Sequence, residues 1–156
     1  MHDDAILAEI GAAFCDTIPV PRERLVNSRG LEPRAINQLL TGKSWRELTA
    51  NVLFKYDEQA DASAIIAFLS DDAYRHFLPA FMSFVLSQGK NAGLIIDALL
   101  FRLAEERSGW SPSLFNGQQR SAVRSFLQAL ALQHAHDEST CTQIEVAMVR
   151  WKEPVG

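Results

Sequence analysis

Residues 70–88 read S-D-D-A-Y-R-H-F-L-P-A-F-M-S-F-V-L-S-Q, and they form a strongly amphipathic segment. Ser70 is of a residue type that caps helices, and the acidic pair Asp71 and Asp72 suits the positive end of a helix dipole. Most of the later positions are apolar, which predicts a helix that is buried over most of its circumference. We therefore expect this helix to lie at the centre of the fold.

The polar residues of this helix form a narrow stripe that the sequence predicts to face solvent. Asp72, His76, Ser83 and Ser87 lie four, seven and four positions apart, and Pro79 falls on the same stripe. A proline inside a helix lacks a backbone donor and displaces the carbonyl four residues earlier. Water can bind that carbonyl on a solvated face, so we expect Pro79 to curve the helix around the core rather than to act as a hinge.

Apolar spacing predicts further helices on both sides of this segment. Apolar residues recur at intervals of three and four between positions 4 and 16, 96 and 103, and 123 and 130, as on one face of a helix. Cys141 to Trp151 follow a similar spacing, and Pro154 is expected to end that helix. No segment alternates as a strand would. We predict an all-α fold, with residues 1–156 forming one domain of roughly six to eight helices.

Capping patterns mark where two of these helices begin. Ser44 and Glu47 have the spacing of a capping box, in which each side chain bonds the other's backbone N–H, and they predict a short helix as far as about Phe54. Asn116 and Gln119 resemble the same arrangement at the start of a later helix.

Composition and charge exclude several classes of protein. Of the 156 residues, 47% are apolar and 22% are charged, and the net charge is −4. No basic cluster is dense enough for the phosphate contacts of a nucleic-acid-binding protein. The longest apolar run, Leu94–Phe101, contains Asp97 and is too short to span a bilayer. The acidic N-terminal residues do not resemble a signal peptide, so we expect a cytoplasmic protein that binds neither nucleic acid nor membrane.

Common catalytic and metal-binding patterns are also missing. Residues 41–44 read T-G-K-S, but a phosphate-binding loop needs a preceding strand and a glycine where Asn37 stands. His134 and His136 are two positions apart and point to different sides of a helix, so we expect them at a solvated helix end rather than on a metal. No serine or cysteine lies in a recognisable nucleophile pattern. We expect no enzyme activity, no metal and no nucleotide cofactor.

The cysteines and tryptophans are expected to have structural roles. Cys15 and Cys141 are too few and too far apart for a disulfide scaffold, which favours two reduced thiols in apolar surroundings. Trp45, Trp110 and Trp151 are expected to close edges of the core, each with its indole N–H on a polar partner.

Three motifs carry a resemblance to a known family. Trp45–Leu48 reads W-R-E-L, Phe68–Phe81 reads F-L-S-D-D-A-Y-R-H-F-L-P-A-F, and Gln118–Leu127 reads Q-Q-R-S-A-V-R-S-F-L. Together they resemble a family of small, mostly bacterial helical proteins that is classed only as a domain of unknown function. The resemblance covers about residues 5–130 and departs after His134. It implies a helical fold and supplies no catalytic residues.

The sequence indicates a protein partner more readily than a chemical reaction. Small acidic proteins without a catalytic pattern include inhibitors and immunity proteins that neutralise a toxin, and an acidic surface attracts a basic partner. Exposed acids beside an aromatic residue make Tyr56, Asp57, Glu58 and Asp61 the predicted contact residues. The alternative is a helical adaptor or regulator that binds a partner helix or a small molecule. A small-molecule site would need a convergent polar cluster inside the core, and the sequence shows none.

Overall fold

The central helix begins and ends as its sequence predicts. In the computed structural model, which describes residues 2–152, helix α5 spans Asp71–Gln88. The Ser70 hydroxyl accepts a hydrogen bond from the Ala73 amide at 3.1 Å. Gly89 ends the helix with a φ of +55°. This left-handed conformation strains residues that carry a Cβ atom, so glycine suits the position.

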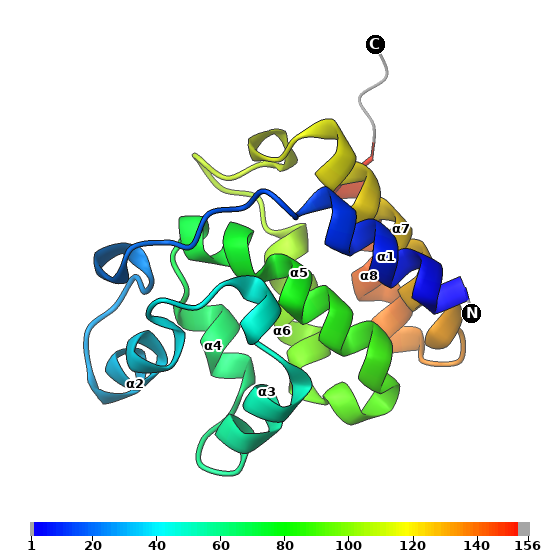
Figure 1. The fold of residues 1–156 in the computed structure, drawn as a ribbon. Helices are drawn as coiled ribbons and strands as arrows, with labels where there is room; N and C mark the ends of the chain where they lie inside the picture. Colours follow the sequence, from blue (N-terminus) through cyan, green and yellow to red (C-terminus); the bar gives the residue numbers. More distant parts are fainter. Residues whose placement is uncertain (1, 153–156) are drawn as a thin grey trace.

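Residues 2–152 form seven further α-helices besides α5 (Figure 1), which confirms the predicted all-α fold. Within residues 2–152 no β-strand occurs, only two isolated bridges, one of which joins Val26 to Leu69. Pro154, predicted to end the last helix, lies outside the described residues. The other helices are α1 (His2–Ala13), α2 (Leu31–Leu40), α3 (Ala50–Asp57), α4 (Ser63–Phe68), α6 (Leu94–Ala104), α7 (Gly117–Gln133) and α8 (Glu138–Arg150), with short 3-10 turns η1 (Arg22–Arg24), η2 (Trp45–Glu47), η3 (Gly89–Ala92) and η4 (Pro112–Leu114).

The helices pack around α5 in pairs. Helix α1 lies along α7, and α6 lies along α8, while α5 contacts α1, α6 and α7 (Figure 1). Phe77 and Phe81 of α5 are fully buried, as are Phe126 of α7 and Phe14, which directly follows α1. One continuous apolar core therefore connects the pairs.

The predicted solvent-facing stripe of α5 is wrong at its centre. Asp72 and Ser87 are exposed, but His76 is only 3% exposed and Pro79 is also buried. The turn η2 covers this side of α5, and the Trp45 amide donates a hydrogen bond to His76 Nε2 at 3.1 Å. The helix continues through Pro79 without a break. Pro79 therefore lies inside the core rather than on a solvated face of the helix.

The capping box at Ser44 and Glu47 is present, but it opens a shorter element than predicted. Both of its reciprocal bonds form, yet only the single turn η2 follows. The chain leaves helical geometry at Leu48, whose ψ is 75°, and Thr49 then caps α3 by accepting a bond from the Val52 amide. The second predicted box, at the start of α7, begins a full helix as expected.

Two predictions for the tryptophans are confirmed, whereas one for a cysteine is wrong. The indole N–H of Trp45 donates to the Phe14 carbonyl at 3.1 Å, and that of buried Trp151 donates to the Leu103 carbonyl at 2.8 Å. Cys15 is exposed rather than buried, because it follows the last turn of α1.

The predicted solvated position of the histidine pair is half wrong. His136 is exposed, but His134 is only 7% exposed. The chain turns directly after α7 into α8, so His134 lies against the second helix: its carbonyl accepts from the Cys141 thiol at 3.1 Å.

Candidate functional site

The four predicted contact residues lie close together at one end of the molecule. Tyr56 and Asp57 belong to the last turn of α3, and Glu58 caps its C-terminus. Asp61 lies in the short connection to α4. Tyr56 is half-buried, while the three acidic side chains are exposed. The segment is therefore partly helical, since α3 continues beyond its predicted end near Phe54 as far as Asp57.

Two of the acids shape the connection between α3 and α4. Asp57 Oδ1 accepts a hydrogen bond from the Ala62 amide at 2.9 Å. Asp61 Oδ1 accepts bonds from the amide and the hydroxyl of Ser63, at 2.9 and 2.7 Å. Glu58 makes no such bond to any of residues 2–152. Its carboxylate is therefore the one of the three whose replacement leaves the local backbone bonds intact.

Asp57 and Asp61 line an open hollow of about 520 Å³ that also has apolar walls; we call it the α3–α4 hollow. Phe54 of α3 is 39% exposed, and Leu94 at the start of α6 is 61% exposed. Phe54 packs edge-on against Phe84 of α5, with 5.2 Å between ring centroids. The hollow thus combines carboxylates with apolar side chains that a partner can cover.

Tyr56 lies in the same acidic surroundings. Its partial burial raises the pKa of the phenol, and the negative charges of Glu32 on α2 and of Asp61 raise it further. The hydroxyl therefore remains protonated at neutral pH and can donate a hydrogen bond to an acceptor. The acidic field of this end of the molecule extends from α3 to α2.

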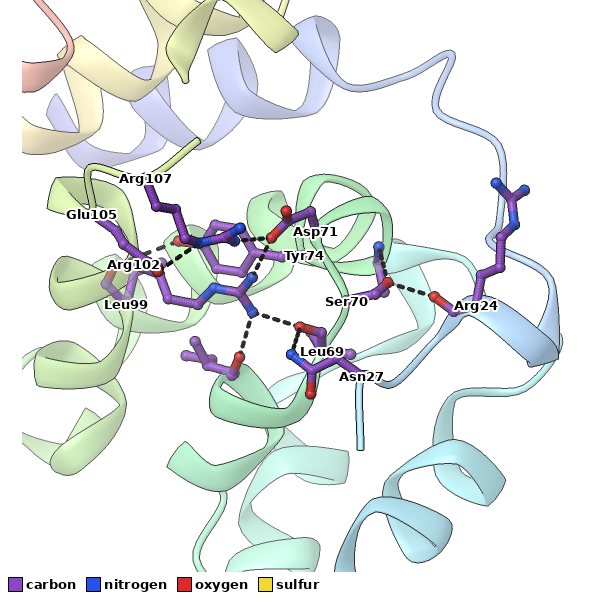
Figure 2. A network of polar contacts seen from close by, with 12 residues as sticks. Arg24, Asn27, Leu69, Ser70, Asp71, Tyr74, Leu99, Arg102, Glu105 and Arg107 are labelled. Carbon is purple, nitrogen blue, oxygen red and sulfur yellow. Dashed lines mark hydrogen bonds and ion pairs between the residues drawn. The ribbon is translucent and has the colours of Figure 1, made fainter. Parts of the chain in front are cut away.

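A second polar cluster lies inside the fold, centred on Arg102 of α6 (Figure 2). Arg102 is only 7% exposed. Its Nη1 donates to the carbonyls of Ile66 and Leu69, both at 2.8 Å, and its Nη2 bonds Asp71 Oδ1 at 3.0 Å. The guanidinium also lies 4.3 Å from the centre of the Tyr74 ring. The expectation of no convergent polar cluster in the core is therefore wrong.

Asp71 connects this cluster to the surface. The same carboxylate oxygen accepts a bond from Arg107, whose Nε also donates to Glu105 at 2.6 Å. The Tyr74 hydroxyl donates to the Leu99 carbonyl at 3.4 Å, and burial raises the pKa of this phenol well above its ordinary value. The charged groups of the cluster bond one another and the backbone, so it holds helices together rather than presenting free groups to a ligand.

The chain between α1 and α2 is bound to the same place. The Ser70 amide donates to the Leu25 carbonyl at 2.9 Å, and the Asn27 amide donates to the Phe68 carbonyl at 3.0 Å. The Ser70 hydroxyl donates to the Arg24 carbonyl, as Figure 2 shows. We call residues 24–27 together with 68–71 the α4–α5 joint.

His76 is a titratable group in the core. Burial lowers the pKa of its imidazole, because a protonated ring loses its hydration there. Nε2 accepts a hydrogen bond from the backbone amide of Trp45, so Nε2 itself carries no proton. Protonation of His76 would turn Nε2 into a donor. Nε2 would then face the donating Trp45 amide, and this hydrogen bond would be lost.

We therefore expect stability to fall as the pH drops below about 6.5, the ordinary pKa of histidine. The unfolded chain binds a proton in this range more readily than the native imidazole, so each pH unit costs up to about 1.4 kcal/mol until the native pKa is reached. Urea denaturation between neutral pH and mildly acidic pH would measure the slope. His76→Gln keeps an acceptor and removes the titration, so its slope should be smaller.

The control for this experiment is His136→Gln, which removes an exposed histidine. Equal slopes for the wild type and His76→Gln would contradict the expectation. The charged residues that line the same surface hollow as His76 are Asp16, Arg24, Asp72 and Arg75.

A family model matches residues 24–155, and its description is "Family of unknown function (DUF6714)". The chain belongs to this family. The match begins later than the resemblance in the sequence implied and extends through α8. It includes the α3–α4 hollow and the Arg102 cluster but leaves out α1. No curated protein and no solved structure shows significant similarity to this DUF6714 member.

The described residues of this DUF6714 protein contain no group of three or more His, Cys, Asp and Glu side chains arranged to hold a metal ion. Among the same residues, no helix has the length and apolar character needed to cross a membrane.

Sequence reasoning missed the apolar part of the α3–α4 hollow. Phe54 lies one helical turn before Asp57, so its nearness to the acids was present in the local pattern. Leu94 and Phe84 come from α6 and α5, and no local signal connects them with α3. The structure brings all three to the same hollow.

Proposed function

We propose that the protein is a non-enzymatic protein-binding module whose α3–α4 hollow holds a basic partner. The observation that carries the proposal is the presence of Asp57 and Asp61 in one open hollow with the exposed side chains of Phe54 and Leu94. Protein interfaces are strongest where apolar anchors are desolvated beside complementary charges. A partner surface with an apolar side chain flanked by lysine or arginine fits this arrangement.

Charge at this end supports a basic partner rather than an acidic one. Glu58 and Glu32 add to the field of the two aspartates, and the net charge of the protein is −4. Such a field accelerates encounter with a positively charged protein and slows encounter with a negative one.

Within this class we propose an immunity protein that acts in the cytoplasm and neutralises a basic toxin. The association is with the class, since fold alone does not determine function. The alternative is an adaptor or regulator that binds a partner helix or a small molecule. A polar hollow beside His76, described below, favours the small-molecule form of the alternative.

Two experiments test the proposal. One captures partners of the protein from the native host, and the other examines the product of the adjacent gene. Expression of the protein should protect cells from that product if it is a toxin, and the two purified proteins should form a complex. If the adjacent product is not toxic and the purified protein binds no basic protein, the immunity proposal is wrong.

For such a complex we expect Glu58→Lys to slow association about three- to tenfold at low salt, because it reverses a charge that steers the partner. The rate of dissociation should change less, and the effect should fade as salt screens the charges. Stopped-flow kinetics at two ionic strengths would measure both rates. Asp57→Lys should act similarly, but it also removes the bond to the Ala62 amide.

Two further variants make the kinetic test specific. Glu145→Lys changes the same charge at an exposed position on α8 and should leave the association rate nearly unchanged. Phe54→Ala removes an apolar anchor, so it should speed dissociation instead. Equal effects of Glu58→Lys and Glu145→Lys would show that net charge matters and that the hollow does not.

A further inference from the structure

A larger hollow lies on another side of α5, where three segments that are distant in the sequence meet. Its volume is about 770 Å³, and its walls are the end of α1 with the following residues 14–21, the first half of α5, and the start of α7. We call it the His76 hollow. In Figure 1 the chain that leaves α1 passes close to the N-terminal end of α5.

His76 contributes a hydrogen-bond donor without an acceptor. Its Nε2 accepts the Trp45 amide, so the single proton of the neutral ring must lie on Nδ1. Nδ1 is shielded from solvent and has no partner among residues 2–152. An unpaired buried donor is costly to the folded protein, and an incoming acceptor would recover that cost. His76 lines the hollow, so an acceptor that enters there and reaches Nδ1 would complete the hydrogen bonding of the ring.

Arg75, the preceding residue, adds a second such donor and a positive charge. Its Nη2 donates to the Leu114 carbonyl and its guanidinium lies 5.5 Å from the centre of the Phe115 ring, but its buried Nε has no partner among the described residues. The N-terminus of α7 borders the same hollow through Asn116, Gln118 and Gln119. The first turn of a helix of this length favours a negative charge.

The remaining walls limit the charge and shape of a ligand. Asp72 Oδ2 lies 3.3 Å from Arg24 Nη1, and Asp16 adds a second carboxylate to the hollow. These two carboxylates would repel a ligand that carries more than one negative charge. Ile18 is 82% exposed and Leu114 is 38% exposed, and both line the hollow. A ligand with one carboxylate and an apolar body fits both parts.

We propose that the His76 hollow binds a monocarboxylate with an apolar body, whose oxygens accept hydrogen bonds from His76 and Arg75. The carboxylate belongs either to a small organic acid or to the C-terminus of a peptide, since both present the same group. This site is separate from the α3–α4 hollow, and its test does not depend on the proposed protein partner.

Nuclear magnetic resonance of the full protein with labelled histidine tests both the tautomer and the ligand. Without a ligand, His76 should show its proton on Nδ1. Benzoate should shift the Nδ1 signal in a saturable way at millimolar concentrations, and benzamide, which has the same shape without the charge, should bind at least about tenfold more weakly. Ala-Ala-Phe with a free or an amidated C-terminus shows whether a peptide carboxylate is preferred to the free acid.

Two variants with opposite expected effects exclude a general loss of folding. Arg75→Gln should weaken benzoate binding about tenfold, because the charged donor is removed. Asp72→Asn removes the opposing charge and frees Arg24, so it should strengthen binding about two- to fivefold. Arg34→Gln, at an exposed position on α2, should have no effect.

The proposal is overturned if neither benzoate nor the free peptide gives a saturable shift of His76. It is also overturned if Arg75→Gln and Asp72→Asn leave the affinity unchanged while both variants keep the melting temperature of the wild type. A proton found on Nε2 would contradict the donor role of Nδ1.

Discussion

Replacing Arg102 by methionine is expected to lower the free energy of unfolding by about 3–5 kcal/mol, because it leaves a buried polar network without its central donor. The carbonyls of Ile66 and Leu69 would both lose the Nη1 donor while they stay buried, and Asp71 would lose one of its two arginine partners. Methionine matches the arginine side chain as far as Nε and keeps the apolar contacts of its stem, so the loss reports on the guanidinium, its hydrogen bonds and its contact with Tyr74. Urea denaturation at neutral pH measures it.

Arg107→Met is the matched control, since it removes the other arginine on Asp71. The Arg107 side chain is 38% exposed, so we expect a loss below about 1 kcal/mol. The two-state transition should be retained in both variants. A similar, small loss for Arg102→Met would mean that water replaces the guanidinium and that the cluster adds little to stability.

Phe77→Ala is expected to destabilise the protein by about 3–5 kcal/mol, the usual cost of removing a fully buried phenylalanine ring. Phe77 is 0% exposed and lies in the middle of α5, with its ring edge-on to that of His76 at 4.8 Å between centroids. Helices α1, α6 and α7 all pack on α5, so a neighbouring helix cannot move to close the cavity without disturbing other contacts.

The control for Phe77 is Phe101→Ala, which removes the same side chain at a position that is 72% exposed. We expect its stability to change by no more than about 0.5 kcal/mol. Chemical denaturation of both variants measures the difference. A loss below about 1.5 kcal/mol for Phe77→Ala would show that the site collapses around the missing ring and that α5 is less constrained than its burial indicates.

The parts of the fold that the sequence predicts well depend on neighbours a few residues apart. Ser70 caps α5 through the amide three residues on, and Asn116 and Gln119 bond each other's backbone at the start of α7. Apolar spacing gives the helices themselves for the same reason, since one face of a helix repeats over three to four residues.

The errors arise where a distant segment determines the surroundings of a residue. His76 and Pro79 follow a polar spacing, but η2, about thirty residues earlier in the chain, covers that side of α5. Arg102 and its carboxylate partner Asp71 are 31 residues apart. The residues next to Arg102 in the sequence therefore gave no sign of this ion pair. A polar residue can be predicted to lie at a surface only if no element from elsewhere in the chain packs on it.

The candidate contact site divides in the same way. Exposed acids near an aromatic residue are visible in the local sequence, which is why Asp57, Glu58 and Asp61 could be predicted as neighbours on the surface. The hollow that Asp57 and Asp61 border depends on Leu94 at the start of α6, which only the packed fold brings beside α3.

The α4–α5 joint has a consequence for how the molecule opens. Residues 24–27 lack regular secondary structure apart from one turn and a bridge, yet their backbone bonds run to the junction that also contains two acceptors of Arg102. Local opening of such a segment normally costs little, because loops exchange their amide hydrogens readily. Here the amides of Asn27 and Ser70 can exchange only when residues 24–27 separate from residues 68–71. A stretch that looks like a linker thus belongs to the same cooperative unit as the central helix.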